Sequence, residues 1–367
     1  MLGMGVNGGT GRNRRATLKK VAEELGVSPS TVSNAYNRPD QLSPQLRERV
    51  FEAARRLGYS GPDPLGRGLR RRKSGAIGVL YTDRLSYAFR DPAAVLFLEG
   101  VSEATEEAGL GLLLIPGAPR EKRDTAAVRE AAVDGMIVFC MAEEDPLLAA
   151  ALERQLPVVL VEQPPVEGLP AVVIDDEGAS REAAEHLIQL GHERIAIASI
   201  ELSYAPEGGL VGAIRQRGAS YRPARARLAG YHAAVEAGGL PWKQTPVYEC
   251  VGHSPDQGRY AARELLSQTP RPTAILCMSD LIAAGVIAEA AARGLSVPGD
   301  LSVVGFDDIP DAARMQPPLT TVNQPHVEKG QKAGRALISL LAGEPAPRTV
   351  SLSTRLVVRG STAPPSA

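Results

Sequence analysis

Cysteine is scarce in this sequence. Its 367 residues include three cysteines, Cys140, Cys250 and Cys277, which lie far apart and form no C-x-x-C pair. This spacing excludes a disulfide framework and a cysteine-based zinc site, and it predicts small buried thiols in a reducing cytosol. The five histidines show no metal-ligand spacing either. We therefore expect neither a metal nor another cofactor.

Long apolar runs are also missing. No stretch approaches the ~20 apolar residues that a membrane-spanning helix requires. Residues 1–15 are rich in glycine and contain no apolar segment of the ~7–15 residues found in a signal peptide. We expect a cytoplasmic protein without membrane contact, beginning with a disordered basic tail over residues 1–15.

The net charge is only −1, but the charged residues are unevenly distributed along the chain. Residues 1–73 contain 15 Lys and Arg and only 6 Asp and Glu, so this segment is +9 and the remainder is −10. A strongly basic end on an otherwise acidic chain indicates a nucleic-acid partner. The length also predicts at least two domains, at ~100–200 residues per domain.

Three short helices are predicted in the basic segment. A hydroxyl cap precedes each helix, and a proline follows two of these caps, as is typical of helix starts. Glycines mark two of the ends. The predicted starts are Thr17, Ser28 and Ser43, and the predicted ends are Gly26 and Gly58.

The first two helices are joined so closely that they form a helix-turn-helix. Only Gly26 and Val27 separate the first helix from the second cap. In this motif the second helix enters the major groove, and its early residues contact base edges. Val32 is expected to pack inward, and the outward residues are Pro29, Ser30, Ser33 and Asn34. By pattern and charge alone, a generic three-helix domain with a solvated basic surface remains the alternative.

Residues 16–33 resemble the DNA-binding headpiece of lactose-repressor-type (LacI/GalR) regulators. The sequence ATLKKVAEELGVSPSTVS matches the family pattern T-[LI]-x-x-V-A-x-x-[AL]-G-V-S-x-x-T-V-S almost without gaps, and Leu57-Gly58-Tyr59 matches the headpiece end. The resemblance implies base-reading positions at Pro29, Ser30 and Asn34, where an Asn amide suits adenine and proline offers only apolar contact. The expected DNA-binding residues of the headpiece are Thr17, Ser28, Pro29, Ser30, Thr31, Ser33 and Asn34.

Residues 62–73 form a Pro-, Gly- and Arg-rich segment. By composition alone it is a flexible basic linker. The resemblance implies instead a hinge that becomes helical on DNA, with Leu69 as the apolar wedge in the minor groove. Asp63 replaces the usual Asn, and Gly66 and Gly68 replace better helix formers. Since each Gly costs about 1 kcal/mol in a helix, we expect greater disorder in the absence of DNA.

From Gly75 onward, short β-rich runs alternate with helices. Buried-strand runs such as residues 76–80, 157–161 and 301–306 are separated by helical segments such as 93–108 and 179–190. This alternation predicts parallel α/β sheets covered on both faces. About 285 residues exceed one typical core, so two lobes are expected.

Polar residues follow several of these strands, but no catalytic signature is present. The sequence lacks G-x-S-x-G, H-E-x-x-H and Walker A patterns. Asp doublets such as Asp175-Asp176 and Asp307-Asp308 do not supply a catalytic pair, because neighbouring side chains generally point apart. We expect no catalytic residues and no enzyme.

The resemblance extends over residues 16–360. Three segments carry it in the core: 190–196, LGHERIA; 227–231, RLAGY; and 303–308 with 318–322, VVGFDD and PLTTV. It implies a periplasmic-binding-protein-like core with a central effector cleft and three crossovers, near Leu190–Glu193, Asn323–His326 and Val350–Thr354. It also implies a structural role for His192 at a helix C-terminus.

Arg227 and Asp307 are the best effector contacts that the resemblance implies. A guanidinium and a carboxylate facing one cleft can bracket adjacent hydroxyls, so we expect a carbohydrate or other polyol. A salt bridge between the lobes is the alternative role for this pair. Arg90 together with Arg227 leaves a sugar phosphate open. The expected effector-binding residues are Thr82, Tyr87, Phe89, Arg90, Arg227, His253, Ser279, Asp307 and Gln324.

These observations predict a sequence-specific transcriptional regulator, specifically a repressor. It is expected to bind double-stranded DNA as a homodimer on a pseudo-palindromic operator, under control of a small effector. The expected domains are a tail (1–15), a helix-turn-helix domain (16–61), a hinge (62–73), a two-lobe core (74–360) and a tail (361–367). A solute-binding transport protein and an α/β enzyme are the alternatives. The first predicts an export signal, and the second predicts a catalytic constellation.

Overall fold

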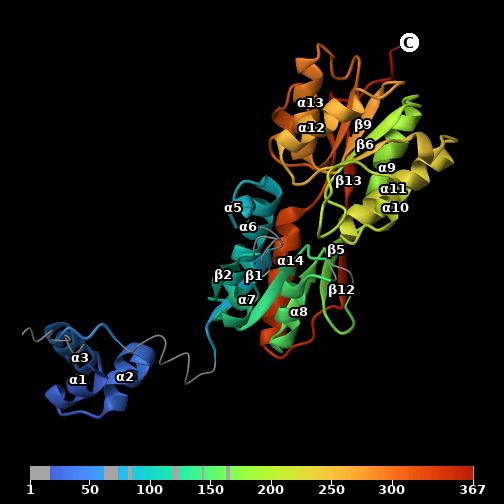
Figure 1. Cartoon of the computed structure of the whole chain (residues 1–367). Helices are drawn as coiled ribbons and strands as arrows, with labels where there is room; N and C mark the ends of the chain where they lie inside the picture. The colour runs from blue at the N-terminus through green and yellow to red at the C-terminus, as the bar shows by residue number, and fades with distance from the viewer. Residues whose placement is uncertain are drawn as a thin grey trace, which may run out of the picture. The chain divides into compact units, whose positions relative to one another are not determined.

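The computed structural model describes residues 17–61, 73–81, 85–117, 124–142, 144–162 and 166–366, and leaves out the side chain of Tyr87. The chain divides into two compact units, Met1–Ser74 and Gly75–Ala367. Figure 1 shows the helical first unit and the larger α/β second unit. Each unit is described on its own.

The first unit contains α1 (Leu18–Leu25), α2 (Pro29–Asn37), a 3-10 turn η1 (Pro39–Gln41) and α3 (Pro44–Leu57). The three predicted caps are confirmed, because Thr17, Ser28 and Ser43 each accept a hydrogen bond from the backbone N–H three residues later. Gly26 and Gly58 end their helices in the left-handed conformation, at φ 67° and 70°. Glycine adopts this conformation without the cost that a Cβ imposes.

A small apolar core holds the three helices together. Val21, Val32 and Val50, one from each helix, are completely buried at its centre. Tyr36 packs its ring edge-on against Phe51, with ring centroids 5.0 Å apart. The inward position of Val32 confirms the predicted face of α2 and leaves its early residues at the surface.

Lobe 1 of the second unit is a six-stranded, fully parallel sheet in the order β12-β5-β4-β3-β1-β2. Its strands are β1 (Ala76–Tyr81), β2 (Gly111–Ile115), β3 (Gly135–Phe139), β4 (Val158–Val161), β5 (Ala171–Ile174) and β12 (Thr349–Leu352). Its helices are α5 (Leu85–Ala88), α6 (Pro92–Glu107), α7 (Ala126–Glu130), α8 (Pro146–Glu153) and α14 (His326–Leu341).

Lobe 2 is a seven-stranded sheet in the order β13-β11-β10-β9-β6-β8-β7. Its strands are β6 (Ile195–Ser199), β7 (Gly209–Leu210), β8 (Val247–Glu249), β9 (Ala274–Cys277), β10 (Ser302–Asp307), β11 (Thr320–Asn323) and β13 (Arg355–Val357). The five central strands are parallel, whereas β13 and β7 pair antiparallel at the two edges. Its elements outside the sheet are α9 (Asp176–Gln189), α10 (Ala213–Arg217), α11 (Arg222–Ala237), η2 (Trp242–Gln244), α12 (Pro255–Leu265), α13 (Asp280–Ala292) and η3 (Ala312–Arg314). The two predicted parallel α/β lobes are confirmed.

The chain passes between the lobes three times. The predicted crossovers near Asn323–His326 and Val350–Thr354 are confirmed, because β11 leads into α14 and β12 leads into β13. The crossover predicted near Leu190–Glu193 is wrong. Asp175, between β5 and α9, makes this passage, since the buried face of α9 packs on α11 and on the sheet of lobe 2. The Leu190–Glu193 segment therefore connects α9 to β6 within lobe 2.

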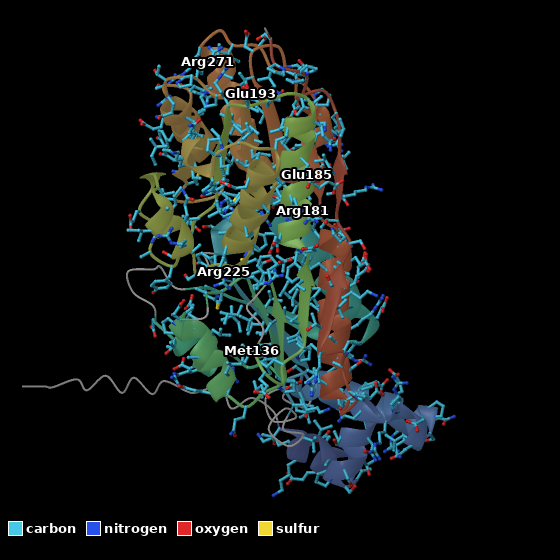
Figure 2. The ribbon with its side chains drawn as sticks, turned by 90° about the vertical axis from the view of Figure 1, so that its right-hand side faces the viewer. Met136, Arg181, Glu185, Glu193, Arg225 and Arg271 are labelled. Carbon is cyan, nitrogen blue, oxygen red and sulfur yellow. The ribbon has the colours of Figure 1, made fainter. Side chains whose placement is uncertain are left out.

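Glycines allow helices to pack closely in both lobes. A Cβ at Gly100 of α6 would collide with the backbone oxygen of Val327 on α14. A Cβ at Gly230 of α11 would collide with the backbone oxygen of Glu177 on α9. The outer face of α9 carries charged side chains such as Arg181 and Glu185, 3.8 Å apart (Figure 2).

The residues beyond 360, expected to form a tail, begin against the sheet of lobe 2. The hydroxyl of Ser361 is buried, accepts from the N–H of Thr320 and donates to the carbonyl of Val303. His192 is structural as expected, but its partners are not helix carbonyls. Its ring nitrogens lie 2.9 Å from the Thr273 hydroxyl and 2.9 Å from the carbonyl of Ala363. This histidine therefore ties the end of the chain to the sheet.

Candidate DNA interface and effector site

The first turns of α2 present a polar surface. Pro29 and Ser30 are exposed, and Ser33 and Asn34 are partly exposed. The Asn34 side chain donates to the amide oxygen of Gln41 at 3.3 Å, which orients it from the following turn. Four predicted base-facing residues thus share one side of a short helix.

Several predicted DNA-binding residues also stabilise the local structure of the headpiece. The hydroxyls of Thr17 and Ser28 cap α1 and α2. The Ser28 hydroxyl also lies 2.7 Å from that of Ser30 and 2.8 Å from that of Thr31. This hydroxyl cluster fixes the start of α2, and leaves the backbone there well ordered for contact with a duplex.

The neighbouring helices α1 and α3 carry exposed basic side chains. Three of them pair with surface carboxylates: Lys19 with Glu23, Arg55 with Glu48 and Arg56 with Glu24. Exposed pairs of this kind contribute little to stability, so these cations remain available to phosphates. Leu69 and residues 62–72 of the predicted hinge lie outside the described residues.

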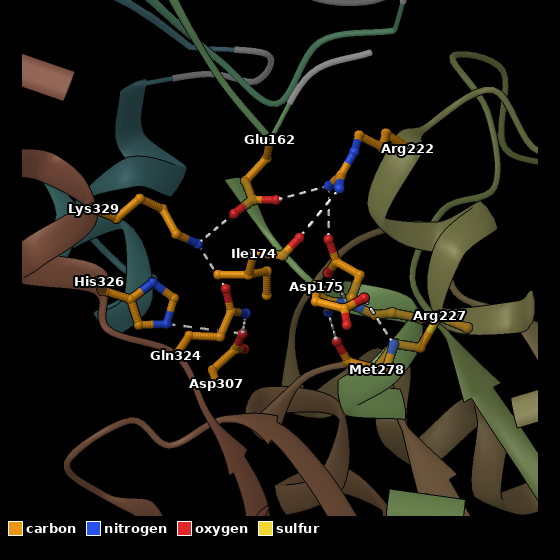
Figure 3. Close-up of polar contacts among 12 residues, drawn as sticks. Glu162, Ile174, Asp175, Arg222, Arg227, Met278, Asp307, Gln324, His326 and Lys329 are labelled. Carbon is orange, nitrogen blue, oxygen red and sulfur yellow. Dashed lines mark hydrogen bonds and ion pairs between the residues drawn. The ribbon is translucent and has the colours of Figure 1, made fainter. Parts of the chain in front are cut away.

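In the second unit, polar residues at the carboxyl ends of strands from both lobes meet at the lobe junction (Figure 3). Ligands bind open α/β sheets at these strand ends. We use the name junction cluster for the eight residues Glu162, Asp176, Arg222, Arg227, Asp307, Gln324, His326 and Lys329.

Arg227 is buried within lobe 2 by specific partners. Its guanidinium donates to a carboxylate oxygen of Asp176 at 3.0 Å and to the carbonyl of Met278 at 2.6 Å. It also stacks on Phe306, with Cζ 3.7 Å from the ring centroid. Burial opposes the charge of Arg227, but Asp176 and then Asp307 raise the pKa of the guanidinium above its usual value. Its ion-pair partner Asp176 begins a helix of the same lobe, so this pair is not the predicted alternative of a salt bridge between the lobes.

Arg222, also on α11, is the residue that connects the lobes. It donates to Asp176 at 2.8 Å, to Glu162 at 3.4 Å and to the carbonyl of Ile174 at 3.2 Å. Glu162 and Ile174 follow or end strands of lobe 1, whereas Asp176 begins a helix of lobe 2. A single guanidinium therefore spans the junction.

Lys329 completes the network from α14. Its ammonium lies 2.6 Å from Glu162 and donates to the Gln324 side chain at 2.7 Å. Gln324 in turn donates to Asp307 at 2.7 Å. Burial raises the pKa of Glu162, although the charge of Lys329 acts against this shift. Burial, then the charges of Lys329 and Arg227, lowers the pKa of His326 well below its usual value, so its imidazole is neutral.

The backbone holds Asp307 in an unusual conformation. Its φ is 133°, and that of Asp308 is 55°. The Asp280 carboxylate accepts from the N–H of Ile309 at 2.9 Å, and Arg359 donates to Asp308 at 2.7 Å. Residues held in sparsely populated conformations cluster at functional sites, because the surrounding structure must maintain them.

The remaining predicted effector residues lie apart from this network or outside the described part of the chain. The hydroxyl of Ser279 caps α13 by accepting from the N–H of Ile282 at 3.2 Å. His253 is partly buried in the loop between β8 and α12, and Phe89 and Arg90 are exposed after α5. Thr82 and the side chain of Tyr87 lie outside the described residues.

The prediction missed five of the eight cluster residues: Glu162, Asp176, Arg222, His326 and Lys329. Two of them carried a sequence signal. Glu162 directly follows a buried strand, and Asp176 belongs to a doublet after the next strand. No local pattern distinguishes Lys329 from a surface lysine of α14, because only tertiary packing buries it to 2% exposure.

Within the described ranges, no group of three His, Cys, Asp or Glu side chains is arranged to hold a metal ion. No helix in the same ranges is both long and apolar enough to cross a membrane.

The fold and the junction cluster define a class: a helix-turn-helix unit joined to a two-lobe core of the periplasmic-binding-protein type. Residues 184–362 match the periplasmic binding protein-like domain, and residues 17–61 match the lacI family of bacterial regulatory proteins. An HTH-type transcriptional regulator of Mycolicibacterium smegmatis is 44% identical over 362 residues, covering 96% of this chain and 98% of the relative. The transcriptional repressor CytR of Escherichia coli K12 is 33% identical, covering 95% and 96%. The chain belongs to the LacI family of DNA-binding transcriptional regulators.

Solved structures agree with this assignment. A LacI-family regulator from Corynebacterium glutamicum matches with a TM-score of 0.73 and 37% identity, covering 95% of this chain and 98% of that one. A CelR–cellobiose complex matches with a TM-score of 0.67 and 31% identity, covering 95% of this chain and 100% of that one. The lac repressor dimer bound to operator and the anti-inducer ONPF matches with a TM-score of 0.76 and 26% identity, covering 95% of this chain and 100% of that one. Family membership confirms the predicted regulator and excludes the enzyme and transport-protein alternatives.

Proposed function

We propose that this chain is a repressor whose affinity for its operator is controlled by a small polyhydroxylated effector bound at the junction cluster. The junction cluster is the observation that carries this proposal. It joins the two lobes through Arg222, which donates to Glu162, and through Lys329, which donates to Gln324. It also lies at the strand ends where such folds bind ligands. A ligand inserted there changes the contacts that hold the lobes together.

The chemistry of the cluster suits a sugar or similar polyol. Arg227 offers donors, Asp307 offers acceptors, and Gln324 offers both. Phe306, under the Arg227 guanidinium, closes an apolar side of the site. Two family structures support this ligand class, since CelR is bound to cellobiose and a LacI-family regulator from Enterococcus faecium is bound to ribose. We include Thr82, Tyr87, Phe89, Arg90, His253 and Ser279 as further effector contacts that a bound structure would test.

The headpiece, which is the helix-turn-helix domain of residues 16–61, binds the operator. Pro29, Ser30 and Asn34 contact bases, and the exposed Lys and Arg side chains contact phosphates. Residues 62–73 act as the hinge, and Leu69 is the wedge in the minor groove. Two such chains form a homodimer on a pseudo-palindromic operator, as in the lac repressor dimer. We place this regulator in the cytoplasm, the compartment that holds the DNA it binds.

A salt titration of binding to a random duplex tests the DNA half of this proposal. If the headpiece neutralises several phosphates, log K falls linearly with log salt, with a slope of about −0.9 per phosphate contact. A variant without residues 1–61 should lose this binding. No measurable binding of the full chain at low salt would refute DNA recognition.

A thermal-shift screen of neutral sugars and polyols tests the effector half. A true effector at 100 times its Kd stabilises the chain by about 2.7 kcal/mol. Arg227→Met should remove this stabilisation. If no sugar or polyol stabilises the wild-type chain, or if Arg227→Met responds as the wild type does, the effector site is misplaced.

A further inference from the structure

Every cation of the junction cluster already has a carboxylate partner. Lys329 pairs with Glu162 at 2.6 Å, and Arg227 pairs with Asp176 at 3.0 Å. Arg222 pairs with both carboxylates, at 3.4 Å and 2.8 Å. Figure 3 shows these contacts as one continuous network between α11 and α14.

The burial of these groups makes their charge balance important. Asp176 is completely buried, and Lys329 and Glu162 are 2% and 5% exposed. A buried charge that loses its partner is strongly unfavourable, because solvent cannot replace the partner. An unpaired Lys or Arg in this position would therefore attract an anion strongly, and both are residues that bind phosphate.

We propose that Glu162 and Asp176 act as a charge filter, so that the junction site accepts an uncharged polyhydroxylated ligand and rejects its phosphorylated form. This inference rests on the proposed function, because it concerns the selectivity of the same site. A phosphate entering the site must lie beside two carboxylates, and each cation it could bind is already compensated. Hydroxyl groups both donate and accept, so they can join the network without adding charge.

Asp307 adds to this selectivity. It faces Arg227 and His326 from the end of β10, and its carboxylate accepts a hydrogen bond from Gln324. Burial, then the neighbouring Asp280, raises the pKa of Asp307 well above its usual value. Burial and the neighbouring Asp280 thus disfavour a negative charge at this point of the site. The same surroundings disfavour a dianionic phosphate.

Removing one filter carboxylate should convert the site into an anion site. In Glu162→Gln, the side chain keeps its size but no longer neutralises Lys329 and Arg222. The probe is inorganic phosphate, titrated calorimetrically into the full chain at constant ionic strength without DNA. We expect no saturable binding to the wild type. We expect saturable binding to Glu162→Gln, with a Kd at least ~tenfold below the highest phosphate concentration at which the wild type shows none. The double variant Glu162→Gln with Lys329→Met should lose the phosphate binding that Glu162→Gln gains.

Asp176→Asn is an independent second variant, because it frees Arg222 and Arg227 instead. We expect the same gain of phosphate binding for Asp176→Asn, which keeps the test possible if Glu162→Gln fails to fold. Glu289→Gln is the matched control: Glu289 also joins two arginines, Arg263 at 3.1 Å and Arg293 at 3.3 Å, but it lies between α12 and α13. Those arginines are largely solvated, so this control should gain no phosphate binding.

Three results would overturn the charge filter. The first is saturable phosphate binding to the wild type that Lys329→Met or Arg90→Gln abolishes. The second is folded Glu162→Gln and Asp176→Asn proteins that bind phosphate no better than the wild type. The third is an equal gain in Glu289→Gln. By contrast, the absence of any polyol response in the thermal-shift screen would refute the effector site itself.

Discussion

At the residue scale, Arg222 does more for the second unit than its partly exposed position suggests. It is 21% exposed, yet it satisfies two buried carboxylates and a backbone carbonyl from both lobes. Arg222→Met leaves Asp176 with Arg227 alone and Glu162 with Lys329 alone. We expect a loss of about 1–3 kcal/mol in the free energy of unfolding, the usual cost of a buried group that loses a partner.

The control for Arg222→Met is Arg181→Met. Arg181 lies on the outer face of α9 and pairs with Glu185 at 3.8 Å, with both side chains about half exposed (Figure 2). Its loss should change stability by less than ~0.5 kcal/mol. Chemical denaturation of both variants makes the comparison, and equal effects would show that the bridge between the lobes adds nothing.

His326 gives the junction a pH dependence. Its pKa falls well below 6.5 in the folded chain, chiefly because it is buried. The unfolded chain therefore takes up a proton before the folded chain does, so stability is lost as pH falls below about 6.5. Between pH 7 and pH 5, the wild type should lose up to about 2 kcal/mol relative to His326→Gln. Denaturation curves of both proteins across this range measure the difference, and parallel profiles would contradict the buried neutral imidazole.

Sequence reasoning identified Arg227, Asp307 and Gln324, and the structure places all three in the junction cluster. Arg227 and Asp307 could be found because they belong to segments that resemble the family, and Gln324 because it follows such a segment. Arg222 and Lys329 could not, since Glu162, the partner that they share, lies 60 and 167 residues away from them in the sequence. Glu162 could have been predicted, because a charged residue directly after a buried strand usually needs an oppositely charged or hydrogen-bonding partner.

At the scale of elements, local chemistry was the reliable guide. The hydroxyl caps at Thr17, Ser28 and Ser43 and the glycine ends of α1 and α3 depend only on adjacent residues, and all were predicted. The first crossover was misplaced because it depends on which sheet the apolar face of α9 covers. That choice is tertiary, and the periodicity of α9 is the same for either lobe.

The close packing of α9 and α11 leads to a prediction about Gly230. A methyl group there meets the backbone oxygen of Glu177, and a backbone atom cannot move aside as a side-chain tip can. Gly230→Ala should therefore destabilise the second unit by about 1–3 kcal/mol through overpacking.

Gly212 provides the matched control for this prediction. A Cβ at this position meets nothing within 4 Å. Gly212→Ala should stay within ~0.5 kcal/mol of the wild type. Thermal or urea unfolding of the two variants distinguishes steric overlap from a general effect of replacing glycine.

At the scale of the whole molecule, the opposite charges of the two parts fit one division of roles. In the function we propose, the basic segment contacts the operator and the acidic core binds the effector. The junction cluster would give such an effector a means of action, because the bonds from Arg222 to Glu162 and from Lys329 to Gln324 cross between the lobes. A ligand acts on DNA affinity only through its differential contacts with two states of the protein.

The most direct test of the account is the affinity for a selected operator with and without the polyol that stabilises the chain. A duplex selected from a random pool supplies the operator. We predict that the polyol changes the operator Kd by ~5–150-fold, the usual range of allosteric coupling, and that Arg227→Met binds the operator normally but shows no change. A stabilising polyol that leaves operator affinity unaltered in the wild type would contradict the account.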